Sequence, residues 1–286
     1  MKSKTVLITG ASAGFGRIAA EMLLHRGHRV IAALRGGQAR LEKEFLAAHL
    51  QTGRLHAVDL HLEQPGTFRA AVSEVAQKFQ GRLDVLINNA GYGQMGPVEI
   101  LDEALLRKQM EVNFFGTALL TQALLPAVRE AGGRIINVSS IVGRVGLPFY
   151  GAYAASKFAL EGYSESLWYD LRPLGVQVGL VEPGGYRTEF SPKVSREGLP
   201  SADPTGVYAH RLDLFRKSVA KKNFSPGRDP TDVARVMVRL SERRRLPFRT
   251  VLGGDAKLAV FIRRLLPEWL RLRLMDWTMR RKFFAE

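Results

Sequence analysis

The chain has 286 residues, of which 46% are hydrophobic and none is Cys. This composition is typical of a folded globular protein, and it excludes disulfides and thiolate zinc sites. Lys and Arg (42) outnumber Asp and Glu (27), and the formal net charge of +15 attracts anionic ligands, membranes and nucleic acid alike. No nucleic-acid-binding motif accompanies this charge, so we interpret it as a solvated basic surface and expect no nucleic-acid partner.

The start of the chain, MKSKTVLITG, lacks the long apolar core of a signal peptide. No window holds the roughly 18 consecutive apolar residues of a membrane-spanning helix. The lack of Cys fits a reducing compartment. We therefore expect a cytoplasmic protein, and contact with one side of a membrane stays open.

Short apolar runs alternate with helical patterns along most of the chain. The predicted strands cover residues 5–8, 29–34, 54–60, 83–88, 134–139, 176–182 and 248–253. The predicted helices cover residues 18–24, 41–50, 67–79, 105–129, 153–171 and 233–240, the last one capped by Thr231-Asp232. This alternation predicts an α/β fold with a Rossmann-type, doubly wound parallel sheet and helices on both of its faces.

A glycine-rich segment separates the first predicted strand from the first predicted helix. It reads TGASAGFG over residues 9–16, with Gly10, Gly14 and Gly16 spaced as G-x-x-x-G-x-G and with Ser12 and Phe15 between them. Glycines let the backbone approach a pyrophosphate, and the N-terminus of the following helix offers N–H groups to it. The position between strand and helix favours a dinucleotide site over an ordinary turn.

A second group of residues has the chemistry for proton transfer. Tyr153 and Lys157 are four residues apart, which places them on one helix face. A nearby ammonium lowers the pKa of a phenol, so the pair predicts a proton donor, although a packing contact between ring and Lys stem would have the same spacing. Ser140 ends a predicted strand 13 residues before Tyr153, and Asn113 lies inside a predicted helix, where Asn is otherwise an indifferent choice.

These motifs together resemble the short-chain dehydrogenase/reductase family, from about residue 4 to residue 192. Residues 88–97 and 181–184 resemble its branch similar to 17β-hydroxysteroid and retinol dehydrogenases. The resemblance implies an oxidoreductase that passes a hydride between NADP(H) and a carbonyl or secondary alcohol of an apolar, steroid-, retinoid- or lipid-like substrate. A non-catalytic NADP(H) sensor and an epimerase on the same fold are the alternatives, and the complete set of reacting residues disfavours the sensor.

The resemblance also implies the roles of single residues. Tyr153 is the general acid in reduction and the base in oxidation, Lys157 lowers its pKa and holds the nicotinamide ribose, Ser140 orients the substrate oxygen, and Asn113 supports a water that relays protons. The implied cofactor-binding residues are Gly10, Ser12, Gly14, Phe15, Gly16, Arg35, Asp59, Leu60, Asn89, Ala90, Gly91, Tyr153, Lys157, Pro183, Gly184, Tyr186 and Thr188. No metal site is expected.

The end of the second predicted strand bears on the choice of cofactor. The acidic residue that selects NAD in the family would fall at Leu34, and Arg35 follows at once. A guanidinium can bind a phosphate with two parallel hydrogen bonds, so we predict a preference for NADP(H), with Arg40 as a second cation. The alternative is that Arg35 is an ordinary loop cation.

The last part of the chain differs in character. We assign residues 1–255 to the catalytic domain, with residues 189–228 as a substrate loop or an ordinary insertion, and residues 256–286 to a basic amphipathic helical tail that Pro267 interrupts. The tail could pack on the core, pair subunits or lie on an anionic membrane, and packing or pairing is the commoner outcome for an apolar stripe.

The family resemblance implies a homodimer or homotetramer. Candidate substrate-wall residues are Tyr92, Met95, Phe149, Tyr150, Tyr186 and Phe190.

Overall fold

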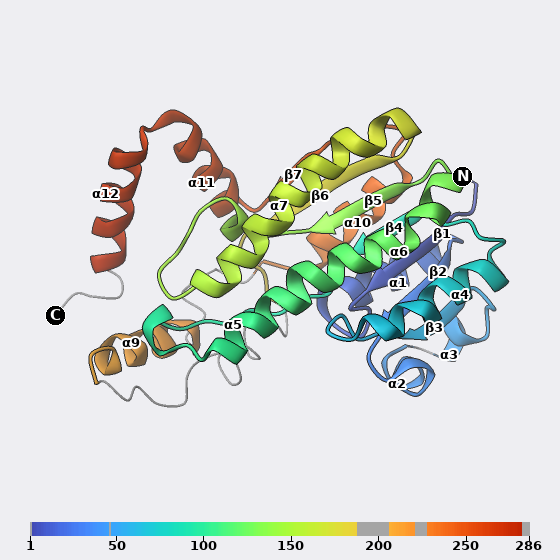
Figure 1. The fold of residues 1–286 in the computed structure, drawn as a ribbon, viewed down its shortest axis with the longest axis horizontal. Helices are drawn as coiled ribbons and strands as arrows, with labels where there is room; N and C mark the ends of the chain where they lie inside the picture. Colours follow the sequence, from blue (N-terminus) through green and yellow to red (C-terminus); the bar gives the residue numbers. More distant parts are fainter. Residues whose placement is uncertain (1, 46, 188–205, 221–227, 282–286) are drawn as a thin grey trace.

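The computed structural model describes residues 2–45, 47–187, 206–220 and 228–281. Its centre is a seven-stranded, all-parallel sheet in the order β3-β2-β1-β4-β5-β6-β7 (Figure 1). The strands are β1 (Thr5–Thr9), β2 (Arg29–Leu34), β3 (Leu55–Asp59), β4 (Val85–Asn88), β5 (Arg134–Val138), β6 (Gln177–Pro183) and β7 (Arg249–Leu252). The predicted doubly wound sheet is therefore confirmed, and its switch in strand order lies between β1 and β4.

Helices cover both faces of this sheet. One face carries α1 (Gly14–His25), α2 (Gly37–Glu44) and α10 (Thr231–Glu242), and the other carries α4 (Phe68–Lys78), α6 (Gly116–Glu130) and α7 (Gly151–Leu171). Successive strand residues pack alternately into the two hydrophobic cores, one on each face of the sheet. Val6 and Ile8 pack with α1 and α10, whereas Leu7 packs with α4 and α6. Strands buried on both faces explain the continuous apolar runs in the sequence.

Two predicted helices are interrupted. The stretch 105–129 divides into α5 (Glu103–Met110), a π-helical turn η3 (Glu111–Phe115) and α6. The stretch 41–50 divides into α2 and α3 (Ala47–Leu50), because Phe45 between them is extended. The predicted cap at Thr231-Asp232 is wrong: Pro230 precedes α10, and the Asp229 carboxylate accepts the N–H of Thr231 at 2.8 Å.

The C-terminal segment forms two helices at the carboxyl end of the sheet. α11 (Gly254–Leu265) follows β7 directly, and α12 (Glu268–Met279) begins after Pro267, as predicted. Figure 1 shows both helices projecting away from the sheet, at the end opposite the N-terminus. In the described part of the chain, no helix has the length and apolarity needed to cross a bilayer. The remaining short elements are η1 (Pro65–Thr67), η2 (Val98–Ile100), η4 (Ile141–Gly143), η5 (Arg172–Leu174) and α9 (Ala209–Ala220).

Candidate active site

The glycine-rich turn joins β1 to α1. Gly10 and Gly14 adopt φ angles of +67° and +53°, which side-chain-bearing residues rarely adopt. A Cβ on Gly16 would lie 2.3 Å from the Gly10 carbonyl oxygen, so only glycine fits where α1 begins. The first turn of α1 carries no acidic residue and no side-chain cap. Its N–H groups and positive dipole end therefore suit a pyrophosphate, as the sequence predicted.

A threonine that the sequence analysis missed fixes this turn to the end of β4. The buried Thr9 hydroxyl accepts the N–H groups of Asn89 and Ala90, at 3.0 and 2.9 Å. The Asn89 side-chain amide donates back to the Thr9 carbonyl at 3.0 Å. The segment 88–91 and the glycine turn are thus held together at the switch point, where open α/β sheets bind ligands. The sequence feature that could have indicated this contact is the Thr directly before the first glycine of the turn.

The residues at the ends of β2 and β3 lie side by side. Leu34 is buried, and the exposed Arg35 follows it. The Asp59 carboxylate accepts the N–H of Gly36 at 2.8 Å and lies 3.2 Å from Nε2 of His61. Leu60 is buried and donates its N–H to the carbonyl of Leu34 at 3.2 Å. The structure therefore brings Arg35, Asp59 and Leu60 to one edge.

Arg40, the predicted second cation, already has a partner. Its Nε lies 2.8 Å from the carboxylate of Glu44, which also binds Arg17 from the first turn of α1 at 3.1 Å. One carboxylate therefore neutralises part of this basic group. Arg35 has no comparable ion pair in the described part of the chain.

The four predicted reacting residues come together from three elements. Tyr153 and Lys157 lie one turn apart on α7, and the Lys157 Nζ atom is 5.9 Å from the Tyr153 ring centroid. The Lys157 ammonium donates to the Val138 carbonyl at 2.9 Å. Ser140 precedes η4, directly after β5, and its side chain hydrogen-bonds with Tyr153. All three sit at the carboxyl edge of the sheet.

Asn113 completes the group from the π-helical turn η3. Its side chain accepts the N–H of Tyr92 at 3.0 Å and donates to the Tyr92 carbonyl at 2.9 Å and to the Ser156 hydroxyl at 3.1 Å. A Cβ on Gly91 would lie 3.1 Å from Asn113 Oδ1 and 3.6 Å from Lys157 Nζ. Asn113 therefore fixes the backbone that leads from the glycine turn to the catalytic pair.

Burial dominates the ionisation of the pair. It raises the pKa of Tyr153 to about 12, and the hydrogen bond with Ser140 opposes that rise. It lowers the pKa of Lys157 to about 8, against the attraction of Glu161. The pKa of the phenol therefore lies above its ordinary value of 10, because removal from water is the largest influence on it. Tyr153 consequently keeps its proton at neutral pH. The predicted effect of the Lys157 ammonium on that pKa stays a prediction.

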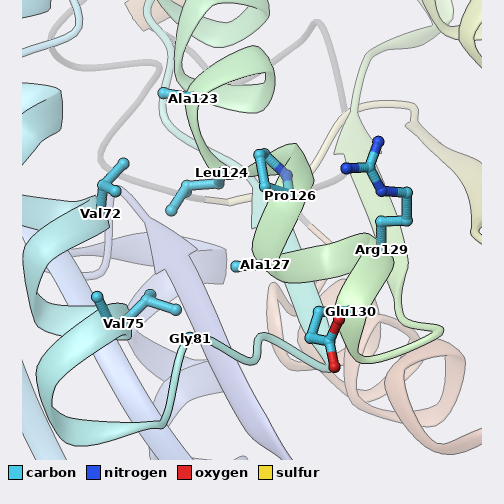
Figure 2. A pocket seen from close by; sticks show the side chains of 10 residues that line it. Val72, Val75, Gly81, Ala123, Leu124, Pro126, Ala127, Arg129 and Glu130 are labelled. Carbon is cyan, nitrogen blue, oxygen red and sulfur yellow. The ribbon is translucent and has the colours of Figure 1, made fainter.

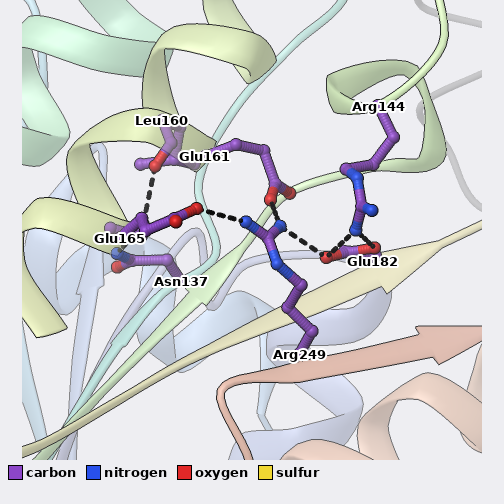
Figure 3. Close-up of polar contacts among 8 residues, drawn as sticks. Asn137, Arg144, Leu160, Glu161, Glu165, Glu182 and Arg249 are labelled. Atoms are coloured by element: carbon purple, nitrogen blue, oxygen red, sulfur yellow. Dashed lines mark hydrogen bonds and ion pairs between the residues drawn. The ribbon is translucent and has the colours of Figure 1, made fainter.

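A group of charges around the buried carboxylates of Glu161 and Glu182 was missed by the sequence analysis (Figure 3). Arg249 on β7 forms ion pairs with Glu161 on α7, with Glu182 on β6 at 3.1 Å and with Glu165 at 2.9 Å, and Arg144 binds Glu182 at 3.3 Å. Burial and the charge of Glu182 raise the pKa of Glu161 to about 7. Arg249 and Glu161 are 88 residues apart in the sequence, so no local pattern predicts their contact.

The segment after β6 meets both the glycine turn and the tail. Gly184 donates its N–H to the Leu252 carbonyl at 2.8 Å, and Gly185 donates to Asp255 in the first turn of α11 at 2.9 Å. The Tyr186 ring packs edge-on against Phe15, with centroids 5.9 Å apart. Two of the predicted cofactor-binding segments, the glycine-rich turn and the segment after β6, are therefore in contact. Thr188 lies outside the described residues.

An apolar cluster surrounds the phenol, and we call it the tyrosine cluster. It consists of the buried residues Met95, Val142, Tyr150, Tyr153, Ala154 and Phe215, with Ile141, Leu147, Phe149 and Met279 packed against them. Met95, Phe149 and Tyr150 therefore lie where a substrate wall was predicted. Tyr92 contacts Asn113 through its backbone, and Tyr186 contacts Phe15 instead. Phe190 lies outside the described residues, whereas Phe215 on α9 and Met279 on α12 were not anticipated.

A separate hollow of about 460 Å³ lies between α4 and α6 (Figure 2). Gly81 and Glu130 in its lining precede β4 and β5, so it lies at the amino edge of the sheet. Its lining is mainly apolar, with Arg129 and Glu130 as the charged groups. Ligands of open α/β sheets bind at the opposite edge, and we do not assign this hollow to the reaction.

Known proteins match the chain over most of its length. The sequence profile described as "short chain dehydrogenase" matches residues 4–198. A 3-ketodihydrosphingosine reductase from Bacteroides thetaiotaomicron is 36% identical over 98% of both chains, and retinol dehydrogenase 8 from Homo sapiens is 37% identical over 86% of this chain and 80% of its own. The crystal structure of a short-chain dehydrogenase from Streptomyces avermitilis superposes with a TM-score of 0.78, at 34% identity, over 97% of this chain and 96% of the other. The chain belongs to the short-chain dehydrogenase family, an oxidoreductase family, and is related to retinol dehydrogenases.

Proposed function

We propose that the protein transfers a hydride between NADP(H) and a carbonyl or secondary alcohol of a long apolar substrate. The observation that carries this proposal is the convergence of Tyr153, Lys157, Ser140 and Asn113 at the carboxyl edge of the sheet, beside the backbone of Gly91. The competing function, a sensor that binds NADP(H) without turnover, has no use for a buried proton donor.

The residues present fit a dinucleotide. The glycine turn leaves the start of α1 without side chains that would block a pyrophosphate, and Phe15, Tyr186 and the segment 89–91 connect that turn to Lys157. When bound, the nicotinamide supplies or accepts the hydride. Ser140 would orient the substrate oxygen, and the protonated Tyr153 would give its proton to that oxygen during reduction. Lys157 would hold the ribose and supply positive charge beside the phenolate that remains.

Arg35 supports the choice of NADP(H). It is an exposed cation at the end of β2, where Leu34 stands in place of the acidic residue that selects NAD in the family. The nearby Asp59 carboxylate accepts the N–H of Gly36, and Arg40 is held by Glu44. We expect kcat/KM for NADPH to exceed that for NADH at least tenfold. The variant Arg35→Ala should lose most of this ratio, because a bidentate guanidinium–phosphate contact contributes about 1.5 to 3 kcal/mol. Equal kcat/KM values for the two cofactors in the parent protein would contradict the assignment.

The tyrosine cluster supports an apolar substrate. Apart from its contacts with Ser140 and Lys157, Tyr153 belongs to an apolar cluster with nine other residues, from Met95 to Met279. The relatives' names refer to a lipid-like ketone and a lipid-like alcohol. We propose that residues 1–255 form the catalytic unit, and that it assembles as a homodimer or homotetramer.

The test is a panel of ketones and alcohols with NADPH and NADP⁺, followed by nicotinamide absorbance and graded from small sugars to steroids, retinoids and long-chain ketones. We expect turnover that increases with apolar length. Tyr153→Phe should retain NADPH binding and lose turnover by at least 10²-fold, the usual contribution of a positioned general acid. NADPH binding without turnover of any compound would favour the sensor instead.

A further inference from the structure

The two C-terminal helices expose an unusual number of large apolar side chains. Seven of them are between 45 and 60% exposed: Leu258, Phe261, Leu265, Trp269, Leu272, Leu274 and Trp277. On α11 the first three follow at intervals of three and four residues, which places them on one face. On α12 the exposed apolar side chains are distributed around the helix, since Leu272 and Leu274 are only two residues apart. Large apolar side chains exposed in such number indicate an interaction site on a folded protein.

Basic residues are interleaved with these apolar side chains. Between residues 254 and 281 there are seven Lys or Arg residues and three acidic ones. The three acids already bind arginines, since Asp255 pairs with Arg228, Glu268 with Arg271 and Asp276 with Arg280. The repulsion of Arg144 and Arg271 adds to burial in lowering the pKa of Arg263, which shows that positive charge is crowded here.

The two tryptophans of α12 each carry an arginine one turn later. The Arg273 guanidinium lies 5.7 Å from the Trp269 ring centroid, and that of Arg281 lies 4.6 Å from the Trp277 centroid. An indole can enter the headgroup region of a bilayer while the guanidinium over its face stays at the phosphate level. Trp and Arg are side chains that favour the interface between membrane and water.

Both ends of this tail touch the candidate active site. At its start, Asp255 accepts the N–H of Gly185, next to the predicted cofactor residue Gly184, and Ala256 is fully buried. At its end, Met279 packs against the tyrosine cluster. The exposed face of the tail therefore lies at the same end of the molecule as Tyr153, as Figure 1 shows for α11 and α12.

We propose that α11 and α12 dock this protein on the surface of an anionic lipid bilayer, with the tyrosine cluster held beside that surface. Charge complementarity selects this occupant. A second copy packed symmetrically on the same face would bring two basic surfaces together, which costs free energy, whereas anionic headgroups neutralise them. The docking stands apart from the proposed reaction, and only the delivery of an apolar substrate from the bilayer depends on it.

The test measures binding of the full chain to vesicles of phosphatidylcholine alone and of phosphatidylcholine with 30% phosphatidylserine, by flotation at 50 and 500 mM NaCl. We expect binding to the anionic vesicles only, reduced at least tenfold at the higher salt. The chain has three tryptophans, so Trp168→Phe leaves Trp269 and Trp277 as the only fluorophores of their kind. Their emission should shift to the blue on binding and should be quenched by brominated lipid.

Two pairs of variants separate the tail from general charge. Arg264→Glu with Arg273→Glu, and Trp269→Ser with Trp277→Ser, should each weaken binding at least tenfold. The control Lys43→Glu with Arg69→Glu changes the net charge as much on exposed positions of α2 and α4 and should retain binding. The proposal is overturned if the anionic vesicles do not bind at 50 mM NaCl, if the control loses as much as the tail variants, or if the tail variants change the oligomeric mass and leave vesicle binding intact. None of these readouts uses turnover, so they are independent of the proposed function.

Discussion

Replacing Lys157 by Met should stabilise the protein at neutral pH, in the absence of cofactor, while it destroys turnover. Lys157 is 4% exposed, and burial lowers the pKa of its ammonium to about 8. The folded protein therefore holds a charged group in surroundings that favour the neutral amine. Met has a stem of similar length and no charge, so it removes this cost.

The magnitude follows from proton linkage. The unfolded chain binds the Lys proton up to its usual pKa of 10.5, whereas the folded protein releases it near 8. The unfolded state thus binds more protons between these values, and stability rises with pH across that window. The difference of about 2.5 pKa units corresponds to a cost of about 3 kcal/mol at pH 7, which falls below about 1 kcal/mol at pH 10. Loss of the hydrogen bond to the Val138 carbonyl opposes the gain by about 1 to 2 kcal/mol at either pH.

The assay is urea unfolding of the parent and of Lys157→Met at pH 7, 8, 9 and 10. The stability advantage of the variant should shrink by about 2 to 3 kcal/mol between pH 7 and pH 10. Groups that do not interact with Lys157 titrate alike in both proteins and cancel in the difference. Lys108→Met, at an exposed position of α5, is the matched control and should show no such trend. A difference between Lys157→Met and the parent that does not change with pH would refute the argument.

Three further substitutions test other parts of the site. Gly16→Ala should weaken NADPH binding more than tenfold in a fluorescence titration, because its Cβ would meet the Gly10 carbonyl at 2.3 Å, and an unchanged Kd would contradict the role of the turn. Thr9→Val leaves two partly buried N–H groups without their acceptor and should lower the free energy of unfolding by about 1 to 3 kcal/mol, whereas Thr52→Val on the surface should cost less than about 1 kcal/mol. Arg249→Met should cost about 3 to 5 kcal/mol at pH 8 by leaving Glu161 and Glu182 buried without their shared cation. The loss of stability should be smaller at pH 5.5. The folded pKa of Glu161 is about 7, above the usual 4.5, so the folded state binds this proton more tightly than the unfolded state and Glu161 is mostly neutral at pH 5.5. Equal losses at both pH values would argue against this role of Arg249.

Local patterns were sufficient for the sheet. The predicted strand at 29–34 coincides with β2, and each of the other predicted strands overlaps a real one by most of its length. The reason is that a strand buried on both faces must be apolar throughout, and a continuous apolar run can be recognised in the sequence without knowing which strands lie beside it. The proximity of Tyr153 and Lys157 could also be predicted, because both residues lie on one helix and are four positions apart.

What the sequence could not provide depends on contacts between distant segments. The π-helical turn at Asn113 has no local signature, and it sits where Gly116 lets α6 approach the Leu62 carbonyl, from which a Cβ would be only 2.2 Å away. Glu161 and Arg249 become partners only when β7 pairs with β6 beside α7. The raised pKa of Tyr153 could not be predicted, because spacing reveals the ammonium but not the degree of burial.

That burial links the chemistry to the tail. Apolar side chains bury Tyr153, and Met279, which belongs to the helix that exposes Trp269 and Trp277, packs against this cluster. A proton donor shielded in this way can serve a substrate that itself prefers an apolar environment, since little water has to be removed when the two meet. On the proposal of bilayer docking, the exposed apolar side chains of α12 would enter the lipid interface, while Met279 at its end contacts the tyrosine cluster. The Arg residues between them would set the depth, because their guanidinium groups stay at the level of the phosphates.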